Sequence, residues 1–372
     1  MPRPVPILYT IPNFTTAGSG HAMLSIIRRL DRDRFAPAVC VARRGGELDR
    51  EVEALEIPLL EAPFTVAARP LRRLPSQAWK ASRAFAQYRF RLWHSFHYLD
   101  DYSEPIIARM AGARVWVYTK KNMNWNRRSW MVRSFLAGRI AAQNTTMLQS
   151  FFPSGWRRKR ALLVPPGVDV GMFHPQSSPR LEIRNRLGIP AGSVVVACVA
   201  HLVPVKGHPT LLEAVARTPD VHLLVAGRPQ DERYSRDLVT LARDREISHR
   251  VHFLGPVADI PALWEEVDIS VLPTQSLGEG CPVALLEAMA CGKPSIATDV
   301  PGSRDLLRQD VTGILVPPED PPALASALQR MVSSASLREK LGAAARELAV
   351  DRYSIEREAA DYQAMYSEAL GV

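Results

Sequence analysis

Long apolar runs are missing from this 372-residue sequence, which argues against a protein with membrane-spanning helices. No stretch reaches the roughly 18–20 consecutive apolar residues that a membrane-spanning helix needs. Cysteine is scarce as well. The four cysteines are scattered, without a C-x-x-C pair or the Cys/His spacing of a zinc site. We therefore expect a reduced, cytoplasmic protein without a structural metal.

Acidic residues are sparse in the first half of the chain. Residues 1–165 contain 27 Lys and Arg against 11 Asp and Glu, whereas the remainder contains 20 against 27. Such asymmetry indicates an anionic partner for the first half: nucleic acid, an acidic membrane surface or a phosphorylated substrate. The alternative is an ordinary solvated basic surface.

Short β-rich runs alternate with helical stretches along both halves of the sequence. In the first half we predict strands at 4–12, 35–43, 90–96 and 114–119, and helices at 18–30, 71–88 and 102–111. In the second half we predict strands at 193–200, 221–227, 251–255, 268–273 and 294–299, and helices at 208–218 and 354–370. Alternation of this kind predicts parallel sheets covered by helices on both faces.

The alternation breaks once, at the Pro- and Ser-rich stretch 174–180, which is typical of a linker. The fold class predicted is therefore α/β, with two doubly wound, Rossmann-like domains facing a central cleft. We place the first domain at 1–175, the second at 176–353 and a terminal helical segment at 354–372. In open α/β sheets the ligand binds outside the carboxyl ends of the strands, so the cleft is the expected site.

Two carboxylates stand in the stretch GEGCPVALLEAMACGKP, which otherwise has the composition of a buried helix. Pro282 can begin that helix and Gly292 can end it. An unpaired buried carboxylate is costly, so Glu287 needs hydrogen-bond donors, which a ribose diol would supply. Glu279 lies just before the helix, whose free N–H groups favour a phosphate. The alternative is structural: Glu287 pairs with an Arg of the core and Glu279 is solvated.

Two further loops follow predicted strands. Lys206 lies in the loop of AHLVPVKGHPTLLEAV, where a cation can neutralise a diphosphate leaving group. In TTAGSGHAML, which ends at Leu24, two glycines allow the backbone to approach a ligand at a helix start. This turn is not G-x-G-x-x-G and no acidic residue closes the next strand, which argues against dinucleotide binding.

Taken together, these motifs resemble a known family. Ala17-Gly18 at the first turn, PPGVDVGMFHP at 165–175, LVPVKG at 202–207, and E-x(7)-E followed by AMACGKPSIATDVPG occur in this order. The sequence is similar to the retaining GT-B glycosyltransferases of glycosyltransferase family 4. The similarity covers the second domain almost completely and the first more loosely.

The resemblance implies a nucleotide-sugar site. Glu287 would hold the ribose, Glu279 would contact donor-sugar hydroxyls, and Lys206 would bind the diphosphate. The remaining donor-binding positions that it implies are Ala17, Gly18, Leu254, Cys281, Pro282 and Val283. It also implies a UDP-sugar or GDP-sugar donor, transfer with retention of anomeric configuration, no metal and no other cofactor. The terminal helix would cross back to the first domain.

The sequence departs from the family at two places. Where the family commonly has Gly-Arg ahead of the lysine, this chain has Ala200-His201, so His201 would contact the diphosphate in place of the arginine. Where many members have a histidine after the strand ending in VYTKKNMNW, this chain has Lys120, Lys121 and Asn122. Lys121 is nearest in alignment and is the candidate catalytic helper.

Several polar residues of the first domain are candidates for the acceptor side. His94 and His97 in HSFHYLDD, together with Asn122, would line the cleft, since their spacing matches no standard metal site. The basic, aromatic stretches 69–91 and 155–160 fit peripheral contact with anionic lipid at the inner face of a membrane. They carry no nucleic-acid motif. We therefore expect an anionic or lipid-linked acceptor and no nucleic acid.

Three other functions remain open on the same residues. A nucleotide-sugar epimerase or a sugar phosphorylase would share the fold but need different cleft residues. A non-catalytic nucleotide-sugar or glycan-binding protein would keep the site without turnover, and the residues at His201 and Lys121 are the features that favour it.

Overall fold

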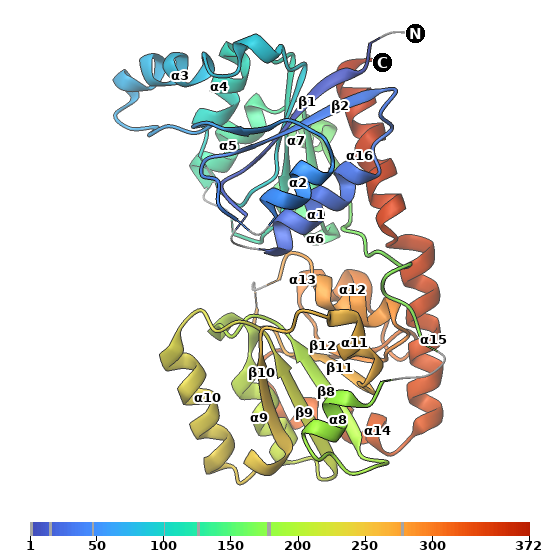
Figure 1. Ribbon diagram of the computed structural model, residues 1–372. Coiled ribbons are helices and arrows are strands. Elements are labelled where there is room, and N and C mark those ends of the chain that lie inside the picture. Colours follow the sequence, from blue (N-terminus) through green and yellow to red (C-terminus); the bar gives the residue numbers. More distant parts are fainter. Residues whose placement is uncertain are drawn as a thin grey trace. The chain divides into compact units, whose positions relative to one another are not determined.

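The sequence folds into two α/β units, which we describe separately from a computed structural model (Figure 1). The structure describes residues 3–14, 17–46, 48–99, 101–124, 127–176, 180–276 and 279–372. Unit 1 comprises Met1–Pro166 and Ile355–Val372, and unit 2 comprises Gly167–Ser354. Both sheets are parallel and carry helices on both faces, so the doubly wound α/β fold class is confirmed.

Unit 1 is built on a seven-stranded sheet in the order β3-β2-β1-β4-β5-β6-β7. Its strands are β1 (Val5–Ile11), β2 (Phe35–Val41), β3 (Leu59–Glu61), β4 (Leu92–Ser95), β5 (Val115–Lys120), β6 (Arg139–Ala142) and β7 (Ala161–Leu163). Its helices are α1 (Ala17–Arg28), α2 (Asp49–Ala54), α3 (Leu74–Ser82), α4 (Ser103–Met110), α5 (Arg127–Leu136), α6 (Thr145–Phe151), α7 (Gly155–Arg160) and α16 (Ile355–Leu370). The strand order reverses between β1 and β4, and loops at such a switch point commonly bind ligands.

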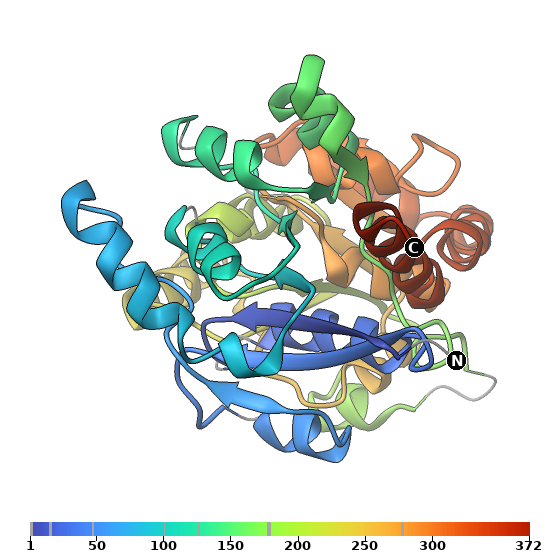
Figure 2. The same cartoon turned by 90° about the horizontal axis from the view of Figure 1, so that it is seen from above.

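Alternate residues of each strand of unit 1 face two separate cores. On β1, Ile7 and Tyr9 pack in the core that includes α1 and α16, while Leu8 packs in the core that includes α3 and α4. This two-residue period is what a strand covered on both faces requires. In both views α3 extends outward from the sheet (Figures 1 and 2).

The terminal helix α16 is part of unit 1 by its contacts. Tyr362, Met365 and Tyr366 are buried in the same core as β1. At the helix surface, Arg29 Nε donates to Glu356 Oε1 at 2.8 Å. Residues 167–175, which the sequence placed in the first domain, contribute Val168 and Phe173 to a core of unit 2 instead.

Unit 2 is built on a six-stranded sheet in the order β10-β9-β8-β11-β12-β13. Its strands are β8 (Val194–Val199), β9 (Val221–Ala226), β10 (Val251–Gly255), β11 (Ile269–Leu272), β12 (Ser295–Thr298) and β13 (Ile314–Val316). Its helices are α8 (Glu182–Arg186), α9 (His208–Ala216), α10 (Glu232–Asp244), α11 (Ile260–Glu265), α12 (Val283–Ala290), α13 (Pro301–Leu306), α14 (Pro321–Val332) and α15 (Ala335–Arg352). The central strand β8 is almost continuously apolar, as expected of a strand buried on both faces.

One predicted helix of the first half is interrupted in the structure, and several helices, among them α10, α14 and α15 of the second half, were not predicted. The helix predicted over 71–88 is a 3-10 turn at Leu71–Arg73, helix α3, and a second 3-10 turn at Ala86–Tyr88. The chain leaves this segment through Arg89, whose φ of 52° lies in the left-handed region and ends any helix there. Strands β3, β6, β7 and β13, each three or four residues long, were not predicted.

Candidate functional site

Two loops at the carboxyl edge of the unit 2 sheet are held against each other. The loop after β8 carries Lys206, and Gly207 follows it with φ 69°. A Cβ on Gly207 would stand 2.0 Å from the carbonyl oxygen of Pro273, so only glycine permits this approach. The amide of Gln275 also donates to the carbonyl of Val205 at 2.9 Å. These contacts fix the lysine loop beside the segment that follows β11.

Lys206 and Glu279 form an ion pair within this edge. The Nζ of Lys206 donates to Oε2 of Glu279, and the two side chains are 20% and 9% exposed. The backbone of Gly302, at the start of α13, packs so closely that a Cβ there would stand 3.2 Å from Cγ of Glu279. The structure thus brings together the two residues that the sequence assigned to the diphosphate and to the sugar.

Glu287 lies one helix turn into α12, after Glu279 in the chain. The helix starts after Pro282, which makes no side-chain capping bond within the described residues. Its first N–H groups therefore remain suited to an anion. Glu287 is half-buried, and burial raises the pKa of its carboxyl to about 7, while the Trp264 indole opposes this rise.

Trp264 is a neighbour of Glu287 that the sequence analysis missed. Its ring is fully buried on α11, and its Nε1 has no hydrogen-bond partner of acceptable geometry among the described residues. Thr274, after β11, and Ser303, on α13, are also fully buried with hydroxyls that have no partner in the described part of the chain. The position of Thr274 directly after a strand in DISVLPT is the signal that could have drawn attention to it.

The other donor-side candidates of unit 2 lie around the same sheet edge. His201 follows β8 and is exposed. Leu254, near the end of β10, and Cys281, before α12, are both partly buried. Pro282 is buried, whereas Val283 is 42% exposed. Their roles in donor binding stay predictions.

At the carboxyl edge of unit 1, Gly18 lies in the first turn of α1 and is exposed, with no atom within 4 Å of the position that a Cβ would take. Of Ala17 only the backbone lies within the described part of the structure. Lys121 follows β5 and is 7% exposed, with its Nζ 3.3 Å from the centroid of the Phe96 ring. Burial holds the pKa of Lys121 well below its usual range, and Glu358 on α16 opposes this.

Lys120 and Asn122 stabilise the loop that also carries Lys121. The Nζ of Lys120 donates to Oδ1 of Asn122 at 2.6 Å and to the carbonyl of Asn124 at 2.7 Å. The same ammonium lies 4.2 Å from the centroid of the Trp130 ring. Asn122 is therefore engaged inside unit 1 through its side-chain oxygen.

The structure places His94 in the interior of unit 1 rather than on a surface. It is fully buried on β4, where its Nδ1 is 2.7 Å from the hydroxyl of Tyr366 and its Nε2 is 2.8 Å from Oγ1 of Thr119. The chain of hydrogen bonds continues from Tyr366 to the hydroxyl of Tyr9 and from Thr119 to that of Tyr362. Burial, with a contribution from Lys121, lowers the pKa of His94 to about 3, so the ring is neutral.

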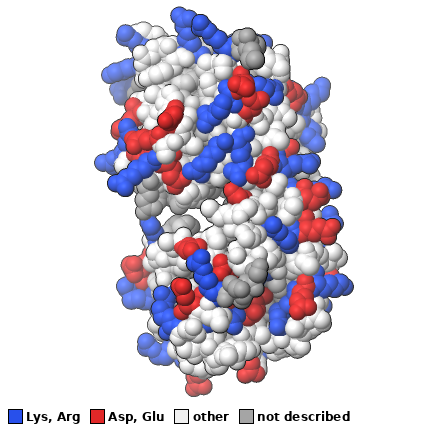
Figure 3. Space-filling model, turned by 45° about the vertical axis from the view of Figure 1, so that its right-hand side comes forward, with Lys and Arg blue, Asp and Glu red and all other residues white. Residues whose placement is uncertain are grey.

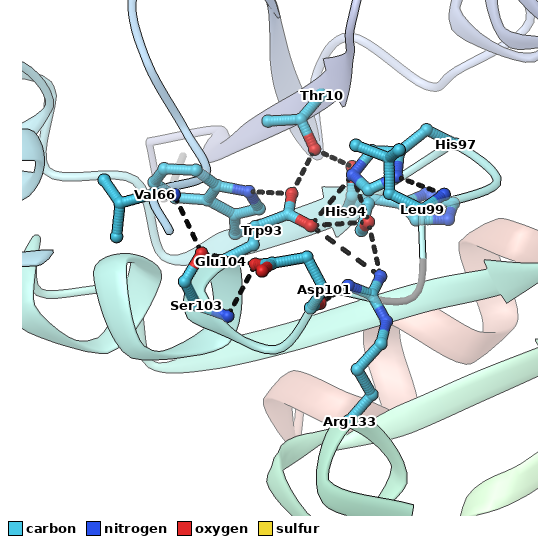
Figure 4. A network of polar contacts seen from close by, with 11 residues as sticks. Thr10, Val66, Trp93, His94, His97, Leu99, Asp101, Ser103, Glu104 and Arg133 are labelled. Carbon is cyan, nitrogen blue, oxygen red and sulfur yellow. Dashed lines mark hydrogen bonds and ion pairs between the residues drawn. The ribbon is translucent and has the colours of Figure 1, made fainter. Parts of the chain in front are cut away.

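His97 belongs to a second buried network, which centres on Glu104 (Figure 4). Oε1 of Glu104 accepts from Thr10 Oγ1 at 2.5 Å and from Trp93 Nε1 at 3.0 Å. Oε2 accepts from Ser95 Oγ at 2.7 Å and lies 3.0 Å from Nε2 of His97. Because the Leu99 amide donates to Nδ1 of His97 at 3.1 Å, the proton of a neutral His97 lies on Nε2 and points to the carboxylate.

Arg133 completes this network from α5. It is fully buried, and its Nη2 lies 3.7 Å from Oε2 of Glu104 and 2.9 Å from Oγ of Ser95. Burial alone would raise the pKa of Glu104, but His97, Arg133 and the Thr10 hydrogen bond lower it to about 2. Neither Glu104 nor Arg133 was a candidate from the sequence.

Within the described residues, no three His, Cys, Asp or Glu side chains are grouped as a metal site would require. No helix among those residues is both long and apolar enough to cross a membrane.

Comparisons with known proteins agree with this architecture. Residues 179–348 match the family described as "Glycosyl transferases group 1". The chain is 35% identical over 227 residues to a D-inositol 3-phosphate glycosyltransferase of Salinispora tropica, a match that covers 57% of this chain and 46% of the relative. The chain thus spans about half the length of the curated relatives that it resembles.

Solved structures share the fold over the whole chain. The crystal structure of Anabaena Alr3699/HepE in complex with UDP and glucose has a TM-score of 0.82 at 21% identity, covering 98% of this chain and 100% of that one. A glycosyltransferase from Rickettsia africae has a TM-score of 0.86 at 18% identity, covering 99% of each chain. The fold is that of the GT-B glycosyltransferases, as the sequence resemblance implied.

Proposed function

We propose that this chain, whose residues 179–348 match the family described as glycosyl transferases group 1, transfers a sugar from a nucleoside-diphosphate sugar to an acceptor hydroxyl with retention of configuration. One observation carries the proposal. Lys206 and Glu279 meet at the carboxyl edge of the unit 2 sheet, next to a helix whose Glu287 is half-buried and has no ion-pair partner among the described residues. Cation, carboxylate and helix start together fit a diphosphate joined to two hydroxyl-rich sugars.

In this proposal the ion pair is exchanged when the donor binds. The diphosphate takes the place of Glu279 as the partner of Lys206, because a phosphate carries more negative charge and more acceptor oxygens than a carboxylate. Glu279 is then free to accept hydrogen bonds from hydroxyls of the donor sugar. Glu287 accepts from the ribose hydroxyls, which supply the donors that its buried carboxyl lacks. His201 and the backbone around Cys281 and Val283 assist at the diphosphate.

The reaction then breaks the bond between the anomeric carbon and the diphosphate oxygen. A bond forms from the acceptor oxygen to the same face of that carbon, and the acceptor proton moves to the departing phosphate oxygen. Lys206 and the N–H groups at the start of α12 stabilise the charge that develops on the diphosphate. We propose that these groups suffice without a metal.

The related proteins and the charges of unit 1 suggest which donors and acceptors to test first. UDP and glucose are bound in the Anabaena protein that shares the fold, so a UDP-sugar is the first donor to test, with a GDP-sugar second. The names of the relatives specify a phosphorylated inositol as their acceptor. An anionic or lipid-linked acceptor near Gly18, Lys121 and Asn122 suits the surplus of cations in residues 1–165, and His94 and His97 would act there by positioning these loops.

A thermal-shift screen against UDP, GDP, ADP and their sugar conjugates, with EDTA present, tests the donor site. Stabilisation by one base, lost in Glu287→Ala and retained in a surface variant such as Glu347→Ala, supports it. Anomeric configuration is then read by NMR on the product of that donor with candidate acceptors. Binding without any transfer would leave a nucleotide-sugar-binding protein, and no shift with any nucleotide would contradict the donor site itself.

A further inference from the structure

One region of unit 1 contains basic residues without acidic ones. From Pro105 to Val168 the sequence has 12 Lys and Arg and no Asp or Glu. Six of these cations make no ion pair with a carboxylate anywhere in the described parts of the chain, namely Arg109, Arg114, Arg157, Arg158, Lys159 and Arg160. On the face that Figure 3 shows, in contrast, cations and anions are intermixed. The unpaired cations therefore form a locally positive surface.

Exposed apolar side chains lie among these cations on α5 and α7. Phe135 is 65% exposed and Trp156 is 39% exposed, and their rings meet edge to face with centroids 5.8 Å apart. The guanidinium of Arg160 lies 5.9 Å from the Phe135 centroid and 5.4 Å from the Trp156 centroid. Val132 and Leu136, on α5, are also exposed. We call these four apolar residues, with the six cations, the α5–α7 patch.

A hollow of about 420 Å³ opens within the α5–α7 patch. Arg109, Arg114 and Arg160 line it together with Phe135, and no carboxylate is among its lining residues. Trp116 also lines it and has a buried Nε1 with no hydrogen-bond partner among the described residues. The hollow thus presents hydrogen-bond donors and positive charge beside an apolar rim, which suits a phosphate attached to an apolar body.

The hollow lies at the opposite edge of the unit 1 sheet from the loops that carry Lys121. Its lining includes Val115, the first residue of β5, and Gly138 and Arg160, which directly precede β6 and β7. Because all these strands are parallel, their first residues share the amino edge of the sheet. The patch is therefore separate from the carboxyl-edge loops of the proposed function.

We propose that the α5–α7 patch docks unit 1 on an anionic phospholipid bilayer. Phe135 and Trp156 enter the boundary between headgroups and acyl chains, the cations bind lipid phosphates, and one phosphate occupies the hollow. The aliphatic residues Val132 and Leu136 suit acyl chains rather than bases. The rings of Phe135 and Trp156 are packed edge to face under Arg160, whereas bases stack on free aromatic faces. Both features favour a lipid over a nucleic acid. This inference does not depend on the donor or on transfer.

Vesicle flotation of the full chain tests the docking surface. We expect binding to vesicles of phosphatidylcholine mixed with phosphatidylglycerol, weak binding to phosphatidylcholine alone, and weaker binding as salt increases. In the double variant Arg114→Glu with Lys159→Glu, the partition coefficient should fall about ten-fold or more, since two cations that attract the anionic membrane are replaced by carboxylates that it repels. Phe135→Ser with Trp156→Ser should lower binding at every salt concentration.

Two matched controls distinguish an effect of the α5–α7 patch from an effect of the protein's net charge. Arg233→Glu with Arg236→Glu on α10 makes the same change in charge at exposed positions of unit 2, and should leave binding within about two-fold. Arg72→Glu with Arg73→Glu makes it beside α3, in the other basic stretch that the sequence suggested for lipid contact, where Trp79 is 58% exposed, and should also leave binding within about two-fold if the α5–α7 patch is the docking surface. Wild-type protein that fails to float would overturn the proposal. So would a control pair that weakens binding as much as Arg114→Glu with Lys159→Glu.

Discussion

The two units each bury a carboxylate, and the surroundings of the two differ sharply. Glu104 in unit 1 is fully buried, accepts from Thr10, Trp93 and Ser95, and faces His97 and Arg133. Its pKa is lowered to about 2. Glu287 in unit 2 is half-buried beside Trp264, and its pKa is raised to about 7 because the Trp264 indole compensates its burial only in part. Fully compensated charge is typical of a structural role, and uncompensated charge is typical of a site that awaits a ligand.

Glu279 stands between these extremes. It is buried like Glu104, yet a single cation, Lys206, is its ionic partner in the described residues. A pair that depends on one flexible lysine can be exchanged for a ligand, whereas the five-partner network of Glu104 cannot be exchanged without rearranging β1, β4, α4 and α5. The comparison therefore predicts that substituting Glu104 lowers stability, while substituting Glu279 lowers activity.

The largest effect is expected at Glu104. In Glu104→Ala, Arg133 would remain buried without its carboxylate, and the free energy of unfolding should fall by about 3–5 kcal/mol. Because the folded pKa of Glu104 is about 2, below its usual 4.5, its contribution is present above pH 4.5 and is lost as pH falls through 2. Urea unfolding at neutral pH and at acidic pH measures both.

The exposed carboxylate of Glu51, which pairs with Arg28 at 2.5 Å, is the matched control. Its substitution by Ala should cost less than about 1 kcal/mol, as solvated ion pairs do. Equal losses from Glu104→Ala and Glu51→Ala would show that the buried network contributes no more than a surface pair.

Glu279→Gln should give the second-largest effect, on turnover. Removal of one group that stabilises the transition state typically lowers kcat about 10²–10³-fold. Binding of UDP should not weaken, because the diphosphate no longer has to displace a carboxylate from Lys206. Lys206→Met should weaken both UDP binding and turnover. If Glu279→Gln loses UDP affinity as strongly as Lys206→Met, the pair acts as one structural unit and the proposed exchange is wrong.

Glu287→Gln should raise stability and weaken nucleotide binding at the same time. With a folded pKa of about 7 against a usual 4.5, ionised Glu287 destabilises the folded state increasingly as pH rises from 4.5 through 7. At pH 8.5 the variant should gain up to about 3 kcal/mol over the wild type, and at pH 4.5 it should gain little. Paired urea titrations at the two pH values measure the difference.

Nucleotide affinity of the same variant gives an independent check. The loss of a charged acceptor for ribose hydroxyls should weaken UDP binding by roughly ten-fold or more. If the variant gains stability at high pH but keeps its UDP affinity, the pKa of Glu287 is raised by burial alone and Glu287 does not bind the donor.

The sequence was sufficient to predict the fold class and three residues at the unit 2 edge. Glu279, Glu287 and Lys206 each follow a recognisable strand, and parallel strands gather such loops at one edge. Glu104 and Arg133 could not be distinguished from surface charges, because 29 positions of chain separate them and their burial depends on how α4 and α5 pack on the sheet. His94 was predicted to line a cleft, but its partner Tyr366 is 272 positions away.

The smallest effect is expected for Tyr366→Phe, which removes hydrogen bonds made by α16. This variant tests whether the buried His94 network of unit 1, unlike Glu287 of unit 2, is free of uncompensated charge. Tyr366→Phe removes a hydroxyl that lies 2.9 Å from Tyr9 Oη and 2.7 Å from His94 Nδ1, and should lower the free energy of unfolding by about 1–2 kcal/mol. Because the pKa of His94 is lowered from 6.5 to about 3, its ring is neutral in both the folded and the unfolded chain above pH 7.5. The loss should therefore be constant from pH 7.5 to pH 8.5 in urea titrations, in contrast to the gain in Glu287→Gln, which should grow as pH rises from 4.5 through 7. A loss in Tyr366→Phe that varies across that interval would mean that the His94 network also holds uncompensated charge, and the contrast between the two units would no longer hold.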